Sequence, residues 1–232
     1  MDPVTAVFLP DFQIKQGGNF TGFLKDSTED MVLNGKIARL TYKGLEQTGW
    51  NINANATKNS IEVNASCKKI SFSDSVFAGN FKFILSSQND HVDFESYWCD
   101  YAGSGGNENG NRSLFSTSGI IKGLAQFEDY PRIQIQLEPS QIVLADTVWK
   151  INPNHNIVLD TASVSIHNLS ISTTTQFLKI DGQIDSTEKS GISVLLSSFT
   201  LRNFKSYLEK KGIHLDGTLY GNLFISHVLH KP

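Results

Sequence analysis

The alternation of apolar and polar residues with a period of two is the feature that most constrains this chain. Successive side chains of a strand point to opposite faces, so the alternation predicts strands with one apolar face. Between residues 49 and 67 it runs through two arms joined by Lys58-Asn59-Ser60, which predicts a hairpin. The apolar positions of the arms are Trp50, Ile52, Ala54 and Ala56, then Ile61, Val63, Ala65 and Cys67.

The same pattern recurs at short intervals along most of the chain. Turn-forming residues such as Pro139-Ser140 separate the segments. Many short strands with frequent turn signals predict an all-β fold, built as a sandwich, a barrel or a solenoid-like sheet. The further apolar positions include Phe77, Phe81, Phe83 and Leu85; Ile133, Ile135 and Leu137; Ile142 and Leu144; Trp149 and Ile151; Val164 and Ile166; Leu169 and Ile171; and Leu178, Ile180 and Ile184.

Two segments depart from the alternation. Residues 103–111 are rich in Gly and Asn, which predicts a flexible surface loop within a single sheet. Residues 203–211 predict one short amphipathic helix, because Phe204, Tyr207 and Leu208 share a helical face. Asn203 is suited to the N-cap of this helix, and Gly212 to its C-terminal end.

The most regular alternation lies near the C-terminus and predicts one long strand over residues 213–225. Its apolar face contains Ile213, Leu215, Leu219, Leu223 and Ile225. Gly217 and Gly221 fall on the same face, and glycines inside a strand indicate bending or a close approach to the backbone.

The composition excludes two classes of protein. Hydrophobic residues make up 39% and charged residues 19% of the 232 residues, and Ser, Thr, Asn and Gly fill the difference. The 15 Phe, 6 Tyr and 3 Trp supply a core, so intrinsic disorder is not expected. The 20 basic residues are dispersed among 23 acidic ones, which argues against nucleic acid as a partner.

No window is apolar enough to span a bilayer, and residues 1–10 lack the pattern of a signal peptide. If the native protein works outside the cytoplasm, we therefore expect this chain to be a piece of it. Cys67 and Cys99 form neither a CxxC pair nor a dense disulfide scaffold, so they leave the compartment open. We expect buried free thiols rather than a disulfide.

The chain lacks the common catalytic motifs, such as GxSxG, GxxxxGK[ST] and HExxH, and we expect no enzymatic activity. One candidate site is His91, Asp93 and Glu95, which would project from one face of a strand as metal ligands or paired carboxylates. Alternation alone also places such residues on the solvent side of a half-buried strand, and we favour that interpretation.

Two other groups of residues give weaker signals. His214, His227 and His230 lie near the C-terminus, but His214 alternates with the apolar face and is expected to face solvent rather than zinc. The N-x-[ST] sequons are too close to the number expected by chance to establish a glycoprotein. They begin at Asn19, Asn55, Asn64, Asn111 and Asn168.

The C-terminal part of the chain resembles the translocation and assembly module family, the TamB-like branch of the AsmA-like superfamily, as found in Bacteroidetes envelopes. The resemblance is good over residues 130–232 and weaker over residues 1–129, where Leu33-Asn34-Gly35-Lys36-Ile37 carries it. The C-terminal segments that carry it are residues 139–149, 165–171, 178–182, 197–199, 203–226 and 231–232.

This resemblance implies a fragment of a longer protein that is anchored in the inner membrane and spans the periplasm. It implies a long curled antiparallel sheet, a β-taco, with an apolar groove, and a β-sandwich remains the alternative fold. The family is linked to phospholipid transport between the membranes and to outer-membrane protein assembly beside an Omp85-type partner. No catalytic residue, metal or cofactor is implied.

Three hypotheses for function follow. The first is a non-enzymatic hydrophobic groove for phospholipid acyl chains, whose backbone must be paired in a sheet because unpaired N–H groups facing hydrocarbon are costly. The second is a scaffold that passes unfolded β-barrel strands along its sheet edges. The third is a carbohydrate-binding or adhesive domain that uses His91, Asp93 and Glu95. The candidate groove residues are Ile133, Ile135, Leu137, Trp149, Ile151, Ile213, Leu215, Leu219, Leu223 and Ile225.

Overall fold

The structure is a computed structural model that describes residues 11–71, 77–99, 117–128, 131–144, 147–187, 190–201, 212, 214 and 216–226. The predicted loop at 103–111 and the predicted helix at 203–211 lie outside the described residues. His227 and His230 also lie outside them, as do Ile213 and Leu215 of the candidate groove.

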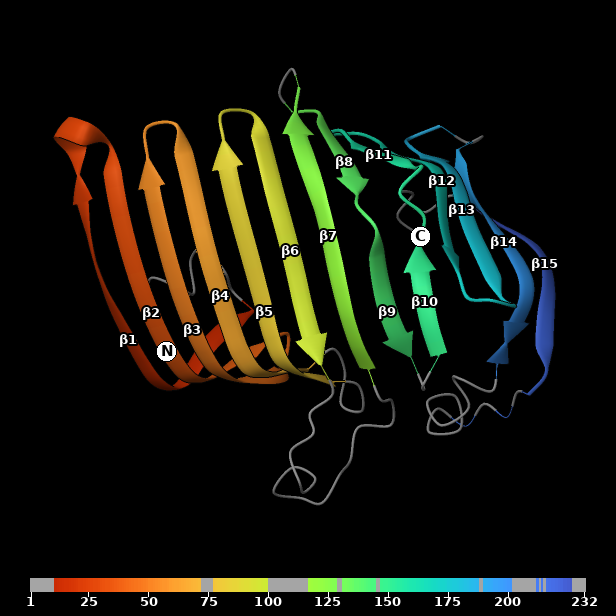
Figure 1. Cartoon of the computed structure of the whole chain (residues 1–232), viewed down its shortest axis with the longest axis horizontal. Helices are drawn as coiled ribbons and strands as arrows, with labels where there is room; N and C mark the ends of the chain where they lie inside the picture. Colours follow the sequence, from red (N-terminus) through yellow and green to blue (C-terminus); the bar gives the residue numbers. More distant parts are fainter. Residues whose placement is uncertain are drawn as a thin grey trace. The chain divides into compact units, whose positions relative to one another are not determined.

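The described chain is almost entirely β-structure, which confirms the predicted fold class (Figure 1). Its strands belong to one antiparallel sheet, whereas a sandwich would have two. A 3-10 turn, η1 (Asp26–Thr28), connects the first two strands. The strands are β1 (Phe12–Lys25), β2 (Asp30–Tyr42), β3 (Leu45–Thr57), β4 (Ser60–Ser71), β5 (Phe77–Gln88), β6 (His91–Cys99), β7 (Thr117–Phe127), β8 (Ile133–Leu137), β9 (Ser140–Leu144), β10 (Thr147–Ile151), β11 (Asn156–Leu159), β12 (Val164–Ser172), β13 (Phe177–Ile184), β14 (Gly191–Thr200) and β15 (Thr218–Ser226).

The chain divides into two compact units. The expectation of a single segment over residues 1–232 stays a prediction. Unit 1 contains Met1–Asn89 and Phe94–Ile120, and unit 2 contains Asp90–Asp93 and Ile121–Pro232.

Unit 1 is a succession of antiparallel hairpins. The predicted hairpin is present as β3 and β4, with the turn at Lys58-Asn59 and with Ala56 paired to Ile61. Positive φ angles at Lys43, Gly44 and Asn89 close the neighbouring turns. A two-residue turn with left-handed residues matches the twist of the strands it joins, so these turns set the register of each pair.

A line of left-handed residues crosses β1, β3 and β5 of unit 1. Gly17, Gly49 and Asn80 have φ angles of 54°, 68° and 46°. Across this line the buried side of β2 changes from odd to even positions, since Ile37 and Leu40, three residues apart, are both 2% exposed. The register is the same on both sides of each of these residues, so the left-handed backbone interrupts the strand pairing without adding a residue to it. The regular alternation of unit 1 therefore ends at this line.

Unit 2 contains two interrupted strands that lie between β7 and β12. β8 pairs with β11, and β9 pairs with β10. β11 and β10 then pair with opposite ends of β12. Pro139 separates β8 from β9 because proline has no N–H to contribute to a strand.

The last strand is shorter than the sequence predicts. β15 has nine residues and begins at Thr218, and the described residues before it, including His214 and Asp216, are not in a strand. The Asp216 carboxylate accepts a hydrogen bond from the Gly217 N–H over 2.8 Å, and Gly217 has a φ of 116°. This local turn determines where β15 begins, because a side chain that hydrogen-bonds to nearby backbone competes with strand pairing.

Candidate functional site

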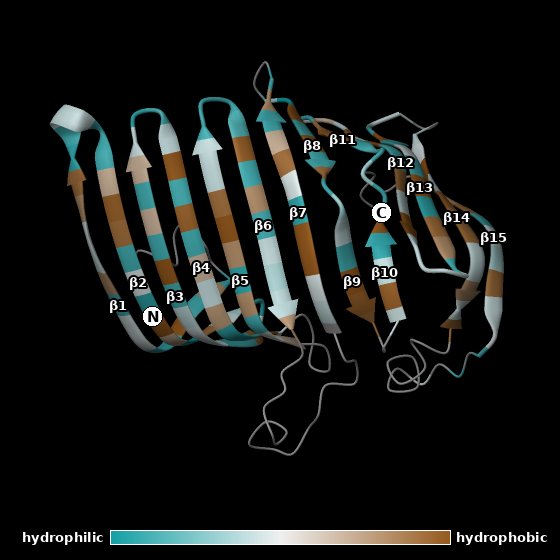
Figure 2. Ribbon diagram, viewed as in Figure 1, coloured by the Kyte–Doolittle hydropathy of each residue, from teal (hydrophilic) through white to brown (hydrophobic). Residues whose placement is uncertain are grey.

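The register of unit 1 aligns its apolar residues in rows that cross five strands. Cross-strand partners in a sheet share a face, so each row lies on one side. In Figure 2 hydrophobic positions alternate with hydrophilic ones along these strands. The rows are Gly22–Leu33–Ala54–Val63–Leu85, Phe20–Gly35–Ile52–Ala65–Phe83 and Leu24–Met31–Ala56–Ile61–Ser87. We call this side the apolar face of unit 1.

The opposite side of the same strands is mainly polar. Asn34, Asn53 and Asn64 form one row across β2, β3 and β4, and the next row contains Lys36 and Asn51. A sheet with this asymmetry buries one face or offers it to an apolar partner. The alternation in the sequence therefore becomes a real difference between the two faces.

The apolar face of unit 1 is covered at one end and exposed at the other. Near the line of left-handed residues, Ile37 is buried, and the Trp50 ring packs edge-on against Phe81 with centroids 6.2 Å apart. Away from that line, several large apolar side chains of the face are at least a third exposed. They are Phe20, Leu24, Met31, Leu33 and Ile61.

Sequence reasoning did not place these β1 and β2 residues in the candidate groove. Phe20 lies between the polar Asn19 and Thr21, but glycines occupy the neighbouring positions 18 and 22 of its face, and Phe23 directly before Leu24 breaks the alternation. The Phe20 ring lies over Gly35, where an added Cβ would be 2.7 Å from a ring carbon. Alternation that counted glycine as a face position would have found this part of the surface.

Unit 2 has an apolar face of the same kind. Its longest row crosses seven strands in the order Ala125–Ile135–Ile157–Ile166–Gly182–Ile192–Ile225. Neighbouring rows are Phe127–Ile133–Leu159–Val164–Ile184, Leu169–Ile180–Val194–Leu223 and Ile151–Ile171–Leu178–Leu196–Gly221. We call this side the apolar face of unit 2.

The structure places the described groove candidates on this face at different depths. Trp149 and Ile151 are buried, and the Trp149 ring packs against Phe199 with centroids 5.7 Å apart. Both residues therefore belong to a packed core and offer little surface to a ligand. Leu137 is half-buried and pairs with Gly123, and Ile133 and Ile135 are half-buried in the rows above. Leu219, Leu223 and Ile225 on β15 are 40%, 56% and 49% exposed.

A line of polar contacts, which no sequence pattern predicts, follows the strand breaks of unit 2. His155, only 6% exposed, accepts a hydrogen bond at Nε2 from the Leu137 N–H and contacts the Asn152 carbonyl through Nδ1. The Ser140 hydroxyl accepts a bond from the Lys122 N–H and donates one to the Glu138 carbonyl. These side chains satisfy backbone groups that the strand breaks leave unpaired.

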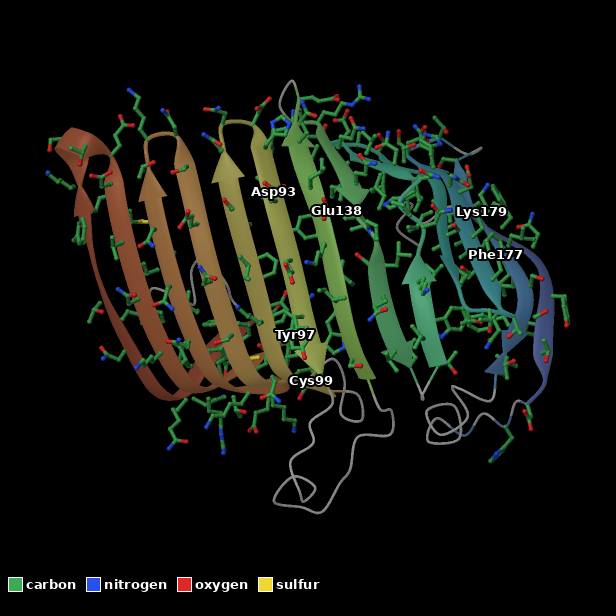
Figure 3. The ribbon with its side chains drawn as sticks, in the orientation of Figure 1. Asp93, Tyr97, Cys99, Glu138, Phe177 and Lys179 are labelled. Carbon is green, nitrogen blue, oxygen red and sulfur yellow. The ribbon has the colours of Figure 1, made fainter. Side chains whose placement is uncertain are left out.

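The line continues onto β12 and β13. The Asn168 side chain donates to the Asn154 carbonyl over 2.7 Å, and the Asn168 N–H donates to the Asp181 carboxylate over 3.0 Å. Lys179 is 3.5 Å from that carboxylate. Glu138, at the first break, and Lys179, on β13, are labelled in Figure 3. The contacts join neighbouring strands through backbone groups, and this arrangement is structural.

The His91, Asp93 and Glu95 candidate does not assemble into a metal site. His91 and Asp93 are exposed and Glu95 is half-buried. Across the described ranges, no three His, Cys, Asp or Glu side chains gather closely enough to hold a metal ion. His91 is 3.0 Å from the Asp90 carboxylate, and this hydrogen bond lowers the pKa of Asp90. The arrangement is that of a solvated strand face.

Both cysteines are free thiols, as predicted, but the structure buries only Cys67 and leaves Cys99 partly exposed, whereas the sequence predicts that both are buried. Cys67 is buried, and desolvation raises its pKa to about 12. Cys99 is partly exposed, and its sulfur accepts a 3.4 Å hydrogen bond from the Asn80 side chain. A thiol with a raised pKa is a poor nucleophile, so Cys67 acts as an apolar filler.

Among the residues that the structure describes, no helix is long and apolar enough to cross a membrane. Comparison with protein-family models, with curated proteins and with solved structures finds no match.

Proposed function

We propose that this chain is a non-enzymatic segment of an envelope protein and that its apolar sheet faces accommodate phospholipid acyl chains. The observation that carries the proposal is the alignment of apolar residues into rows across successive strands, with large side chains left exposed on the same side. Single exposed apolar residues are ordinary on protein surfaces, but aligned ones indicate a binding surface.

The chemistry of the faces suits hydrocarbon. The backbone N–H and C=O groups within the faces are paired in the sheet, so an acyl chain on the face meets side chains and no unpaired polar groups. Each methylene taken out of water contributes about 0.8 kcal/mol, so covering about ten methylenes supplies about 8 kcal/mol before the loss of motional freedom.

The resemblance to TamB-like proteins supplies the biological part of the proposal. In that setting the chain works in the periplasm, within a longer protein anchored in the inner membrane and beside an Omp85-type partner. Lipid moving between the two membranes is then the cargo that an apolar face fits.

Photocrosslinking in cells tests the proposal on a single strand. Probes at Leu219 and Leu223 lie on the apolar face, and matched probes at Tyr220 and Phe224 lie on the opposite face of β15. We expect phospholipid adducts from the first pair and few from the second. Equal yields from the two pairs, or no adducts from the first, would rule out the apolar face as a lipid surface.

A second test uses the isolated chain and unit 1. Replacing Leu24 or Leu33 with Asp puts a charge on the exposed end of the apolar face, and replacing Asn53 or Asn64 with Asp puts the same charge on the polar face. Uptake of a fluorescent phospholipid should fall only for the first pair. The same uptake by both pairs would contradict the proposal.

A further inference from the structure

A polar hollow lies on unit 1 where β1 begins and where β2 turns into β3. Its volume is about 420 Å³, which falls within the roughly 300–1,000 Å³ of small-molecule sites. The lining contains charged and polar side chains and one glycine but no large apolar side chain, so the hollow suits a small polar ligand rather than hydrocarbon. The lining residues are Asp11, Gln13, Lys15, Thr41, Lys43 and Gly44.

The register of β1 and β2 brings the lining residues together. Gln13 pairs with Thr41, and cross-strand partners share a face. One position further along, the Lys43 N–H donates a 3.1 Å hydrogen bond to the Asp11 carbonyl. Leu40 points to the opposite side of β2 from Thr41 and is 2% exposed. The floor of the hollow is therefore backed by a buried part of the sheet.

Lys15 adds a second ammonium group through an irregularity of β1. The register between β1 and β2 shifts between Ile14 and Gln16, and such a shift redirects the side chain of the residue within it. The Lys15 ammonium donates a 2.6 Å hydrogen bond to the Gln13 side-chain carbonyl. This bond holds the charge at the hollow and leaves the other ammonium protons for a ligand.

The hollow contains charges of both signs that do not neutralise one another. Within the described ranges, no ion pair joins the Asp11 carboxylate to the ammonium group of Lys15 or Lys43. Lys43 Nζ instead lies 5.5 Å from the centroid of its neighbouring tyrosine ring. Glu46 is the β3 partner of Thr41, but its carboxylate is 3.6 Å from an arginine and lies outside the lining. Two cationic groups and one anionic group are thus available to a ligand.

We propose that this hollow binds a small ligand that carries a phosphate group and a cationic amine, the chemistry of phosphoethanolamine. Lys15 and Lys43 contact the phosphate, because lysine binds phosphate through charge-assisted hydrogen bonds. The Thr41 hydroxyl donates a further bond, and the amine lies against the Asp11 carboxylate. The site is separate from the apolar faces and does not depend on whether these bind lipid.

An NMR titration of the full 232-residue chain with phosphoethanolamine tests the site through the amide signal of Gly44. We expect this signal to shift and to saturate. The double variant Lys15→Gln/Lys43→Gln should bind roughly tenfold more weakly, about 1.4 kcal/mol. The matched control, Lys25→Gln/Lys36→Gln, removes the same charge from β1 and β2 outside the hollow and should bind like the native chain. A Gly44 signal that does not respond, or equal weakening by both double variants, would overturn the proposal.

Asp11→Asn tests whether the ligand needs its amine. This change should weaken phosphoethanolamine binding and strengthen binding of inorganic phosphate, because asparagine neither attracts an amine nor repels an anion. A change in the same direction for both compounds would refute the role of Asp11.

Flotation with phosphatidylethanolamine vesicles distinguishes a lipid headgroup from a free compound with the same chemistry. The native chain is compared with Lys15→Gln/Lys43→Gln. Flotation that depends on the two lysines supports a headgroup as the ligand, and flotation that does not depend on them supports the soluble compound.

Discussion

The backbone N–H of Leu137 donates a 3.0 Å hydrogen bond to Nε2 of His155. In a continuous sheet, a backbone carbonyl of the neighbouring strand would accept this bond. The acceptor is the side chain because β8 ends at Leu137 and β11 begins only at Asn156. A buried histidine thus maintains the continuity of unit 2 across the strand break. Nε2 accepts only when it carries no proton, so the neutral ring is the form that makes this bond.

Replacing His155 with leucine should destabilise the chain by about 1–3 kcal/mol, because the Leu137 N–H then stays buried without an acceptor. His155→Gln is the matched control, since its side-chain carbonyl can reach the position of Nε2. Urea unfolding followed by circular dichroism measures both. Equal losses from the two variants would show that packing, not the hydrogen bond, explains the role of His155.

Removing the Trp149 ring should have a larger effect. Trp149→Ala removes a side chain that is 4% exposed and packed on Phe199, and losses of about 3–5 kcal/mol are typical of such changes. Trp149→Phe should lose much less, because Nε1 has no hydrogen-bond partner among the described residues and keeps no bond to lose. Chemical denaturation of both variants measures the two losses. A loss from Trp149→Phe as large as that from Trp149→Ala would mean that the indole N–H, which both variants lack, is important.

Two glycines with similar backbone angles should respond differently to alanine. Gly182 and Gly221 have φ angles of 138° and 151°, so alanine is strained at both by about 1–3 kcal/mol. At Gly182 the new Cβ would also lie 2.3 Å from the Gly191 carbonyl oxygen, whereas at Gly221 no atom lies within 4 Å. Gly182→Ala should therefore have the lower melting temperature. Similar melting temperatures would mean that β13 and β14 separate easily.

The two thiols should differ in reactivity. Because burial raises the pKa of Cys67 from 9.0 to about 12, this thiol stays protonated at pH 8.5 and should not react with iodoacetamide in the folded chain. Cys99 is partly exposed and should react. Mass spectrometry should find one label in the native chain and two in denaturant. Rapid labelling of Cys67 in the folded chain would contradict its burial.

The same shift predicts a loss of stability at alkaline pH. The folded pKa of Cys67 is higher than 9.0, so the unfolded chain releases its proton first as the pH rises. The contribution of Cys67 is therefore complete below pH 9 and declines between pH 9 and about 12. Cys67→Ala should show a smaller decline in the free energy of unfolding over this range, which denaturant titrations at several pH values would measure.

The strands could be predicted because their signal is local. The hairpin at residues 49–67 appears with the turn and the apolar positions that alternation indicates, and Ile133, Ile135 and Leu137 form β8. The first residue of β15 could not be predicted in the same way. Alternation continues through Gly217, but the left-handed backbone there and the hydrogen bond that the Gly217 N–H donates to the Asp216 carboxylate delay the start of the strand to Thr218. Alternation reports the face of a residue and not its φ angle.

The candidate site was predicted only in part, for a related reason. The sequence indicates that Trp149 and Leu223 have the same apolar character, yet the first is 4% and the second 56% exposed. Phe199 lies 50 residues after Trp149, and no local pattern predicts that it covers the Trp149 ring. His155 was not considered, because its role depends on a strand break that brings it to Leu137.

The alternation of residue types by itself determines that this chain forms strands and that each strand has an apolar and a polar side, because side chains of a strand alternate between faces. Only the tertiary structure decides how these sides are joined. Register aligns Ile135, Ile166 and Ile225 into one row, left-handed residues end the rows of unit 1, and packing determines which apolar side chains remain exposed. Register and packing depend on partners far apart in the sequence, and a period of two carries no information about them.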